Sequence, residues 1–299
     1  MLDFLSTSYN KLAFTFNIKG DLPAATKYYE KDLAVSEKIS LAQPDNFDAK
    51  RNVASSLERI GSMQVAAGNT DAAFNNFVKG LEIMNAIIDH GPKDNKWSVD
   101  VAVFVGKLGE IWLQRGESDK ALESFQGKLD IAKELVAVDS RENVFQSSLA
   151  TSYRDLGRIH RLRGENTLAE TNFQKALETS TLLVSNNLGN ASLLYELSVS
   201  YNLMGRFYLD TGDKVKAGQN YQADFEIAKS LSEADPNDGN LKVGLATSYL
   251  NLAETDLNKR DNLIAAREIL ETELKKKNQS KTVQTTLNFV IEALAKLPK

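Results

Sequence analysis

The 299-residue sequence contains no cysteine and only two histidines, His90 and His160. Without cysteine the chain has no disulfide framework, no thiolate nucleophile and no cysteine-ligated metal. Two histidines leave little for zinc sites or for triads built on imidazole. The motifs GxGxxG, GxxxxGK[ST], GxSxG and HExxH are also missing. These absences predict a protein that is not an enzyme and that uses no cofactor and no metal.

Charge and hydropathy exclude further classes of partner. The formal net charge of −4 and the isoelectric point near 5.5 argue against nucleic acid. No apolar run approaches the ~20 residues that span a bilayer, and the opening MLDFLSTSYN lacks the basic and long apolar segments of a signal peptide. With 42% hydrophobic and 25% charged residues, the sequence predicts a globular protein of the cytoplasm without a membrane partner.

Internal repetition dominates the sequence. A glycine recurs every 48 residues from Gly20 to Gly212, and Arg260 takes the next slot. Three more columns keep the same interval, namely a second glycine (Gly61, Gly109, Gly157, Gly205), an alanine (Ala25, Ala73, Ala121, Ala169, Ala217, Ala265), and an aromatic residue (Tyr29, Phe77, Phe125, Phe173, Tyr221) that ends in Ile269. The chain is therefore six copies of one unit followed by a tail.

Each copy is predicted to form two helices. In the second copy, residues from about Phe47 to Ala67 carry apolar side chains at helical spacing, and Gly68 supplies the left-handed residue that ends a helix. A second apolar stripe then runs from Ala73 to about Asp89. The small residues of the Gly61 and Ala73 columns mark the crossing of the two helices, and the aromatic column fills the gap between pairs.

The tail is predicted to close the stack, since the ends of a repeat array need a cap. Its apolar residues fall on one face of a helix from Ser280 to Lys296: Val283, Leu287, Val290, Ile291 and Leu294. No stretch shows the alternation of a strand. The sequence thus predicts an all-α solenoid of six helix-turn-helix repeats at about 1–46, 47–94, 95–142, 143–190, 191–238 and 239–278, with a C-terminal capping helix in 279–299.

The order Leu-Gly, aromatic, Gly-Asp, alanine, aromatic resembles the tetratricopeptide repeat (TPR). The clearest copy is LATSYRDLGRIHRLRGENTLAETNF, from Leu149 to Phe173, and SVSYNLMGRFYLDTGDKVKAGQNY, from Ser198 to Tyr221, is nearly as close. The resemblance covers about residues 1–278, although the period is 48 rather than the usual 34 residues. It implies a right-handed superhelix whose concave groove holds a peptide or a protein without catalysis.

In that family the first helix of each pair lines the groove. Counting from the second glycine column, the positions that the resemblance exposes to the groove include the following polar residues: Asn10, Asn17, Glu58, Glu110, Arg154, Arg158, Arg161, Asn202, Arg206 and Glu254.

Two interpretations of the arginines stay open at this point. Guanidinium groups on adjacent helices can grip a carboxylate or phosphate bidentately, which predicts a partner with an acidic segment. Alternatively, Glu110 and Glu254 pair with Arg158 and Arg206, which occupy the same column in neighbouring copies. Two arginines have no obvious acidic mate in the adjacent columns, which favours the first interpretation: Arg154 and Arg161.

The predicted function is a non-catalytic scaffold that binds a peptide or protein segment in its groove. The alternative is a TPR sensor or recruitment region cut from a larger multidomain signalling protein. An enzyme is disfavoured because a dry pocket is hard to build on a solenoid's open surface, and an RNA-binding solenoid is disfavoured by the negative charge.

The N-terminal end carries a last expectation. Copy one starts at Met1, already inside its first helix, and LDFLSTSYNKLAFTF is apolar on too many sides for a solvated terminal helix. We therefore expect further domains upstream of residue 1, or weak self-association through the N-terminal repeat.

Overall fold

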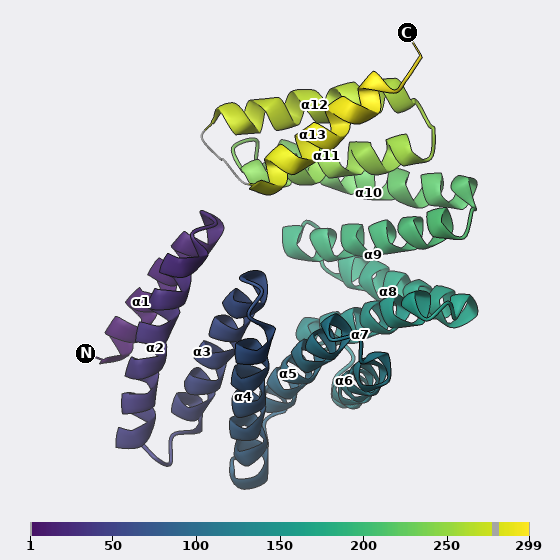
Figure 1. Ribbon diagram of the computed structural model, residues 1–299. Helices are drawn as coiled ribbons and strands as arrows, with labels where there is room; N and C mark the ends of the chain where they lie inside the picture. Colours follow the sequence, from purple (N-terminus) through teal and green to yellow (C-terminus); the bar gives the residue numbers. More distant parts are fainter. Residues whose placement is uncertain (1, 277–280, 299) are drawn as a thin grey trace. The chain divides into compact units, whose positions relative to one another are not determined.

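The computed structural model describes residues 2–276 and 281–298, and within them it contains thirteen α-helices and no strand (Figure 1). The helices are α1 (Leu2–Ile18), α2 (Leu22–Ala42), α3 (Phe47–Ala66), α4 (Thr70–His90), α5 (Asn95–Gln114), α6 (Ser118–Val138), α7 (Asn143–Leu162), α8 (Asn166–Asn186), α9 (Ala191–Asp210), α10 (Lys214–Ala234), α11 (Gly239–Glu254), α12 (Lys259–Lys275) and α13 (Lys281–Ala295).

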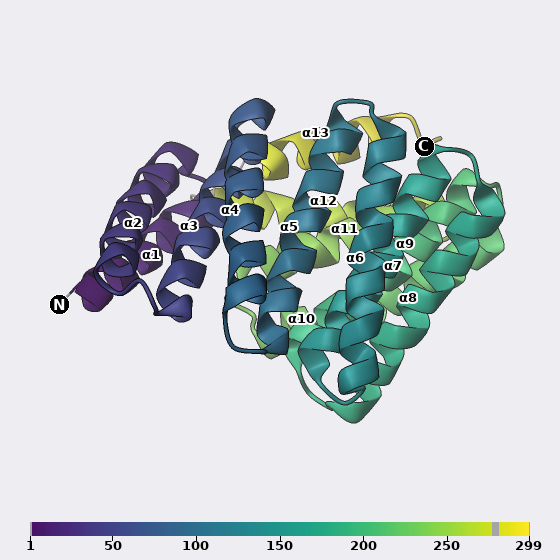
Figure 2. The same ribbon diagram turned by 90° about the horizontal axis from the view of Figure 1, so that it is seen from below.

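The helices are grouped in two units, Met1–Ile159 and His160–Lys299. In the first unit each helix from α1 to α6 packs on the next, and Figure 2 shows α3 to α6 as neighbouring rods. In the second unit each helix from α8 to α13 does the same. The fold is therefore the predicted all-α solenoid of helix pairs, in which α13 packs on α12.

The turn inside each of the first five pairs is made by the first glycine column. Its members have positive φ angles between 75° and 89°: Gly20, Gly68, Gly116, Gly164 and Gly212. Glycine adopts this left-handed conformation without a steric penalty, so it ends one helix and lets the next begin two residues later. The predicted role of the column is confirmed.

The sixth pair departs from the predicted register because Arg260 stands where glycine would end the helix. Here α11 stops at Glu254, and Asp256 and Asn258 take the positive φ angles of 64° and 44°. Asp and Asn are among the few residues that tolerate this conformation. The next helix then packs one residue out of register, so that Ala266 and Leu270, each 0% exposed, are buried in place of the expected Ala265 and Ile269.

The crossing within each pair depends on the small and aromatic columns. An added Cβ at Gly61, Gly109 or Gly205 would lie 2.5–2.6 Å from a ring atom of the aromatic residue sixteen positions later. The alanines of the Ala73 column that precede the irregular sixth copy are completely buried. Close approach of the two backbones therefore requires these side chains to be small.

The cap follows the prediction with one correction. Val283, Leu287 and Val290 are buried against α11 and α12, and Leu294 is partly buried there. Ile291 is 46% exposed, so it lies outside the buried face to which the sequence assigned it. A helix places only three or four positions per two turns on its packed stripe, and Ile291 falls at its edge. Ser280 lies outside the described residues.

The remaining features of the fold are the hydropathy of the helices and the exposed apolar residues of α1. Among residues 2–276 and 281–298, no helix is both long and apolar enough to cross a bilayer. On α1, Phe4 is 81% exposed and Phe14 is 56% exposed, so this helix presents the apolar surface that the sequence predicted.

Candidate functional site

The odd-numbered helices carry the predicted groove positions, and we call the exposed side of these positions the groove face. Ion pairs between successive odd helices run along it. The Arg158 guanidinium donates two hydrogen bonds to Glu110, at 2.6 and 3.4 Å. Arg206 lies 3.3 Å from Glu254 and 3.0 Å from Asp210. The interpretation in which the column charges pair across the stack is therefore confirmed for both arginines.

The other two arginines correct the sequence analysis. Arg161 does have an acidic mate, because its Nη1 bonds Asp210 one repeat further on. Asp210 lies 49 rather than 48 residues away, which is why a search of equivalent positions missed it. Arg154 is only 8% exposed, so it does not stand on the groove face as predicted. A long arginine stem packs readily against apolar neighbours, and the position three residues before the crossing glycine is close enough to them for burial.

The remaining predicted positions also interact within the protein. Glu58 accepts a hydrogen bond from Ser62 at 2.7 Å and lies 3.2 Å from Lys107 Nζ. Asn10 and Asn202 each point their Nδ2 toward a carboxylate on the following even helix, at 3.5 Å. Asn17 is half-buried near the end of α1. The groove face is thus lined largely by polar groups that already have partners.

Three open pockets lie on this face, each between two successive odd helices of one unit. Their volumes are about 220 Å³ between α3 and α5, 360 Å³ between α5 and α7, and 290 Å³ between α9 and α11. Glu58 lines the first, Glu110 the second and Asn202 the third. Each pocket has room for a side chain of a bound segment.

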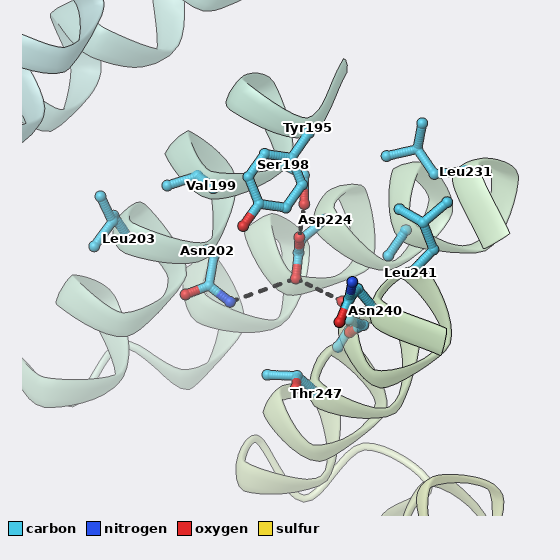
Figure 3. Close-up of a pocket in the computed structure, with 13 residues that line it drawn as sticks. Tyr195, Ser198, Val199, Asn202, Leu203, Asp224, Leu231, Asn240, Leu241 and Thr247 are labelled. Carbon is cyan, nitrogen blue, oxygen red and sulfur yellow. Dashed lines mark hydrogen bonds between the residues drawn. The ribbon is translucent and has the colours of Figure 1, made fainter. Parts of the chain in front are cut away.

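The pocket between α9 and α11 has a buried carboxylate at its base. Asp224, on α10, is 3% exposed and accepts hydrogen bonds from Ser198, from Ser248 at 2.9 Å and from Asn202 at 3.5 Å. Figure 3 shows this carboxylate at the centre of the pocket, with Asn202 and Thr247 beside it. Burial raises the pKa of Asp224, although the hydrogen bonds from its neighbours oppose the shift.

Sequence reasoning missed Asp224 because it searched only the first helix of each pair. The signal was nevertheless present at the repeat interval. Asp32 and Asp224 occupy the same position four repeats apart, and a serine and an asparagine precede each of them at matching distances. A polar set that recurs at buried positions of two copies is a stronger indication than any single charged residue.

Comparison with known proteins agrees with this architecture. The tetratricopeptide repeat family model matches residues 5–43 and 149–187. No curated protein sequence matches the chain.

Several solved structures share the fold at low sequence identity. BtubC (BKLC) from P. vanneervenii is 15% identical over 89% of this chain and 92% of its own, with a TM-score of 0.60. The Rap conjugation gene regulator of plasmid pLS20, solved in complex with the Phr* peptide, is 17% identical over 95% of this chain and 72% of its own, with a TM-score of 0.55. The S. pombe nuclear import adaptor Nro1 is 12% identical over 96% and 98%, with a TM-score of 0.52.

Proposed function

Because the chain belongs to the tetratricopeptide repeat family, we propose that it is a non-catalytic scaffold, acting in the cytoplasm, that binds an extended peptide segment along the groove face. The observation that carries this proposal is that both units have pockets between successive odd helices. Each pocket combines apolar walls with polar groups, which is the lining that holds a side chain and fixes its orientation. The solved complex of a Rap regulator with the Phr* peptide supports it, since that protein shares the fold.

An acidic segment is the version that the sequence suggested, and the ion pairs argue against it. A carboxylate that approached Arg158 would have to displace Glu110, and one that approached Arg206 would have to displace Glu254 and Asp210. Displacing a bound carboxylate by another one gains little free energy. We therefore expect the segment to be read by the pockets rather than by the arginines.

The alternative function, a sensor or recruitment region of a larger signalling protein, makes the same binding prediction for this chain. It differs in what binding achieves, because the occupied groove would then alter an effector domain outside residues 1–299. The fold shared with a conjugation gene regulator supports this alternative.

A random dodecamer display library panned on the immobilised full chain tests the proposal. Thr247 lines a groove-face pocket, and Thr171 is also exposed, on α8; each donates its hydroxyl to the carbonyl four residues earlier. Thr247→Trp fills the pocket and should abolish binding of peptides that occupy it, whereas Thr171→Trp is the matched control. Val103→Trp makes the same test between α3 and α7.

Three outcomes decide the matter. Enriched peptides that lose affinity for the groove-face variants alone support the proposal. A library that enriches no peptide, or peptides that bind all variants equally, contradicts it. Enrichment of Asp and Glu that is lost in Arg206→Glu would restore the acidic segment.

Self-association through α1 stays a prediction. Phe4 and Phe14 are exposed, so a second copy would gain apolar contact there. Sedimentation of the full chain over a concentration series, compared with a Phe4→Ser/Phe14→Ser variant, measures it. A strictly monomeric wild type would refute it.

A further inference from the structure

One position of each even helix lies beneath the groove face, at the base of the space between two odd helices. It faces a position 27 residues later, on the second of those odd helices. The pairs at these positions within the described residues are Asp32 and Arg59, Gly80 and Lys107, Lys128 and Asp155, Ala176 and Leu203, and Asp224 and Asn251.

Two of these pairs are neutralised within the protein. Arg59 Nη1 lies 3.8 Å from Asp32, and Lys128 Nζ lies 2.6 Å from Asp155 with the two charges exchanged. At Gly80 the base carries no charge, and the Phe104 ring occupies the space that a Cβ would need. The position therefore either holds an ion pair or is filled by apolar groups.

Asp224 is the exception. Its carboxylate has the same kind of cradle as Asp32, which accepts hydrogen bonds from Ser6, Asn10 and Ser56. Yet asparagine replaces the facing arginine, and no Lys or Arg of residues 2–276 and 281–298 forms an ion pair with Asp224. The Nδ2 of Asn251 is itself buried without a hydrogen-bond partner. A buried carboxylate without a counter-charge is costly to the fold.

One wall of the space above Asp224 carries a glycine in place of a larger residue. Gly244 lines the pocket where Asn52 stands four repeats earlier, and a Cβ added at Gly244 would meet no atom within 4 Å. The walls are apolar, from Val199, Leu203 and Leu241 (Figure 3). Among the residues that the structure describes, Asp224 is the only charged one that lines the pocket.

We propose that this pocket, which we call the Asp224 pocket, binds the ammonium group of a lysine side chain carried by a peptide on the groove face. The apolar walls cover the four methylenes of the lysine stem, and the carboxylate pairs with the charge at its end. This inference rests on the proposed function, because the lysine is part of the bound segment.

Lysine suits the carboxylate better than arginine does. Ser198 already donates to Oδ1, and Ser248 and Asn202 donate to Oδ2. Bidentate pairing of a planar guanidinium uses both oxygens along one edge, whereas a compact ammonium can use a single remaining lone pair. The ammonium and the carboxylate meet away from water, so their attraction contributes more free energy to binding than a surface ion pair of the kind formed by Arg206 contributes to folding.

The first test needs no peptide. n-Butylammonium chloride, a mimic of the lysine side chain, is titrated into the full chain while the methyl resonances of Leu203 and Leu241 are followed by NMR. We expect saturable shifts that isosteric n-butanol does not produce. Asp224→Asn should weaken n-butylammonium binding at least about tenfold, as expected for loss of a hydrogen-bonded charge, whereas Asp32→Asn, its matched control, should leave the binding unchanged.

A second variant keeps the test decisive if Asp224→Asn alters packing. Asn251→Arg places a guanidinium where Arg59 stands beside Asp32. The new guanidinium should form an ion pair with Asp224 and so prevent the binding of n-butylammonium. Equal shifts in the wild type and both variants, or equal shifts with n-butanol, would overturn the assignment.

The display-library experiment distinguishes failure of this inference from failure of the proposed function. Peptides enriched by the full chain should share a lysine, and the Asp224→Asn chain should enrich peptides without that preference. Enriched peptides that share no lysine overturn the inference but leave the scaffold intact. A pocket that binds n-butylammonium in a chain that enriches no peptide overturns the scaffold and, with it, the peptide as the source of the ammonium.

Discussion

Replacing Gly109 by alanine should destabilise the protein, although alanine is the better helix former. In an open helix the change would gain about 1 kcal/mol. At Gly109, however, the new Cβ would lie 2.6 Å from Phe125 Cε1 and 2.9 Å from its Cδ1, whereas carbon atoms in contact are ordinarily about 3.5–4.0 Å apart. The Phe125 ring would have to move by roughly 1 Å to restore ordinary contact.

The ring has no room to move. Phe125 is 0% exposed and packs in one cluster with Leu129, Leu156 and Ile159. Overpacking of this kind costs about 1–3 kcal/mol. After the gain in helix propensity is subtracted, we expect a net loss of about 1 kcal/mol, which lowers the Tm by about 1–2 °C in a chain of this size.

Thermal unfolding followed by circular dichroism at 222 nm measures the effect. Gly127→Ala is the control, because that Cβ would meet only Val105 Cγ1, at 3.9 Å, so the Tm should rise. In a Phe125→Leu background, where the ring is absent, Gly109→Ala should lower the Tm by less than it does in the wild type. If Gly109→Ala raised the Tm as Gly127→Ala does, our account of the helix crossing would be wrong.

Three further predictions concern charged and titratable groups. Because burial raises the folded-state pKa of Asp224, the folded protein keeps that proton to a higher pH than the unfolded chain, and the free energy of unfolding falls as the pH rises between the two pKa values. Asp224→Asn should therefore have the same urea midpoint as the wild type below about pH 4 and a higher one at pH 7. A double-mutant cycle on Arg158 and Glu110 should give a coupling of about 0.2–1 kcal/mol that shrinks in 1 M salt, and an undiminished coupling would contradict the half-exposed geometry. Burial and the hydrogen bond to Glu170 raise the pKa of Tyr208 to about 12. Tyr208→Phe should therefore remove a step near pH 12 from the absorbance titration at 295 nm, whereas loss of a step near pH 10 would show that the phenol is solvated.

The fold was predictable because the repeat makes the same physical demand in each copy. A glycine in the left-handed conformation, a small residue at the crossing and a buried aromatic can be recognised without any long-range information. The prediction failed at Arg260, where the glycine is missing. A register set by Asp256 and Asn258 follows from backbone conformation, which residue identity alone does not specify.

The candidate site was less predictable because the partner and the burial of a charged side chain change when its position shifts by one residue. Arg161 reaches an aspartate 49 positions away rather than 48, and Arg154 is buried although its neighbour Arg158 is half-exposed. Asp224 could have been found by applying the repeat interval to the second helices as well. Its lack of a counter-charge could be seen only once its neighbours were placed.

The ion pairs along the groove face also bear on how the chain avoids misassembly while it is being made. Similar repeats can stack on the wrong neighbour, and transient errors of that kind trap multi-repeat chains. Here the charges differ from copy to copy, so an error that skips one repeat would set Glu58 against Asp155 in place of Lys107, and would leave Arg161 without Asp210. Each ion pair contributes little to the stability of the finished protein, but the repulsion between Glu58 and Asp155 disfavours this wrong junction. Charges that differ between copies therefore help to select the correct neighbour at this junction, and a consensus version with six identical copies should refold with more aggregation than the natural chain.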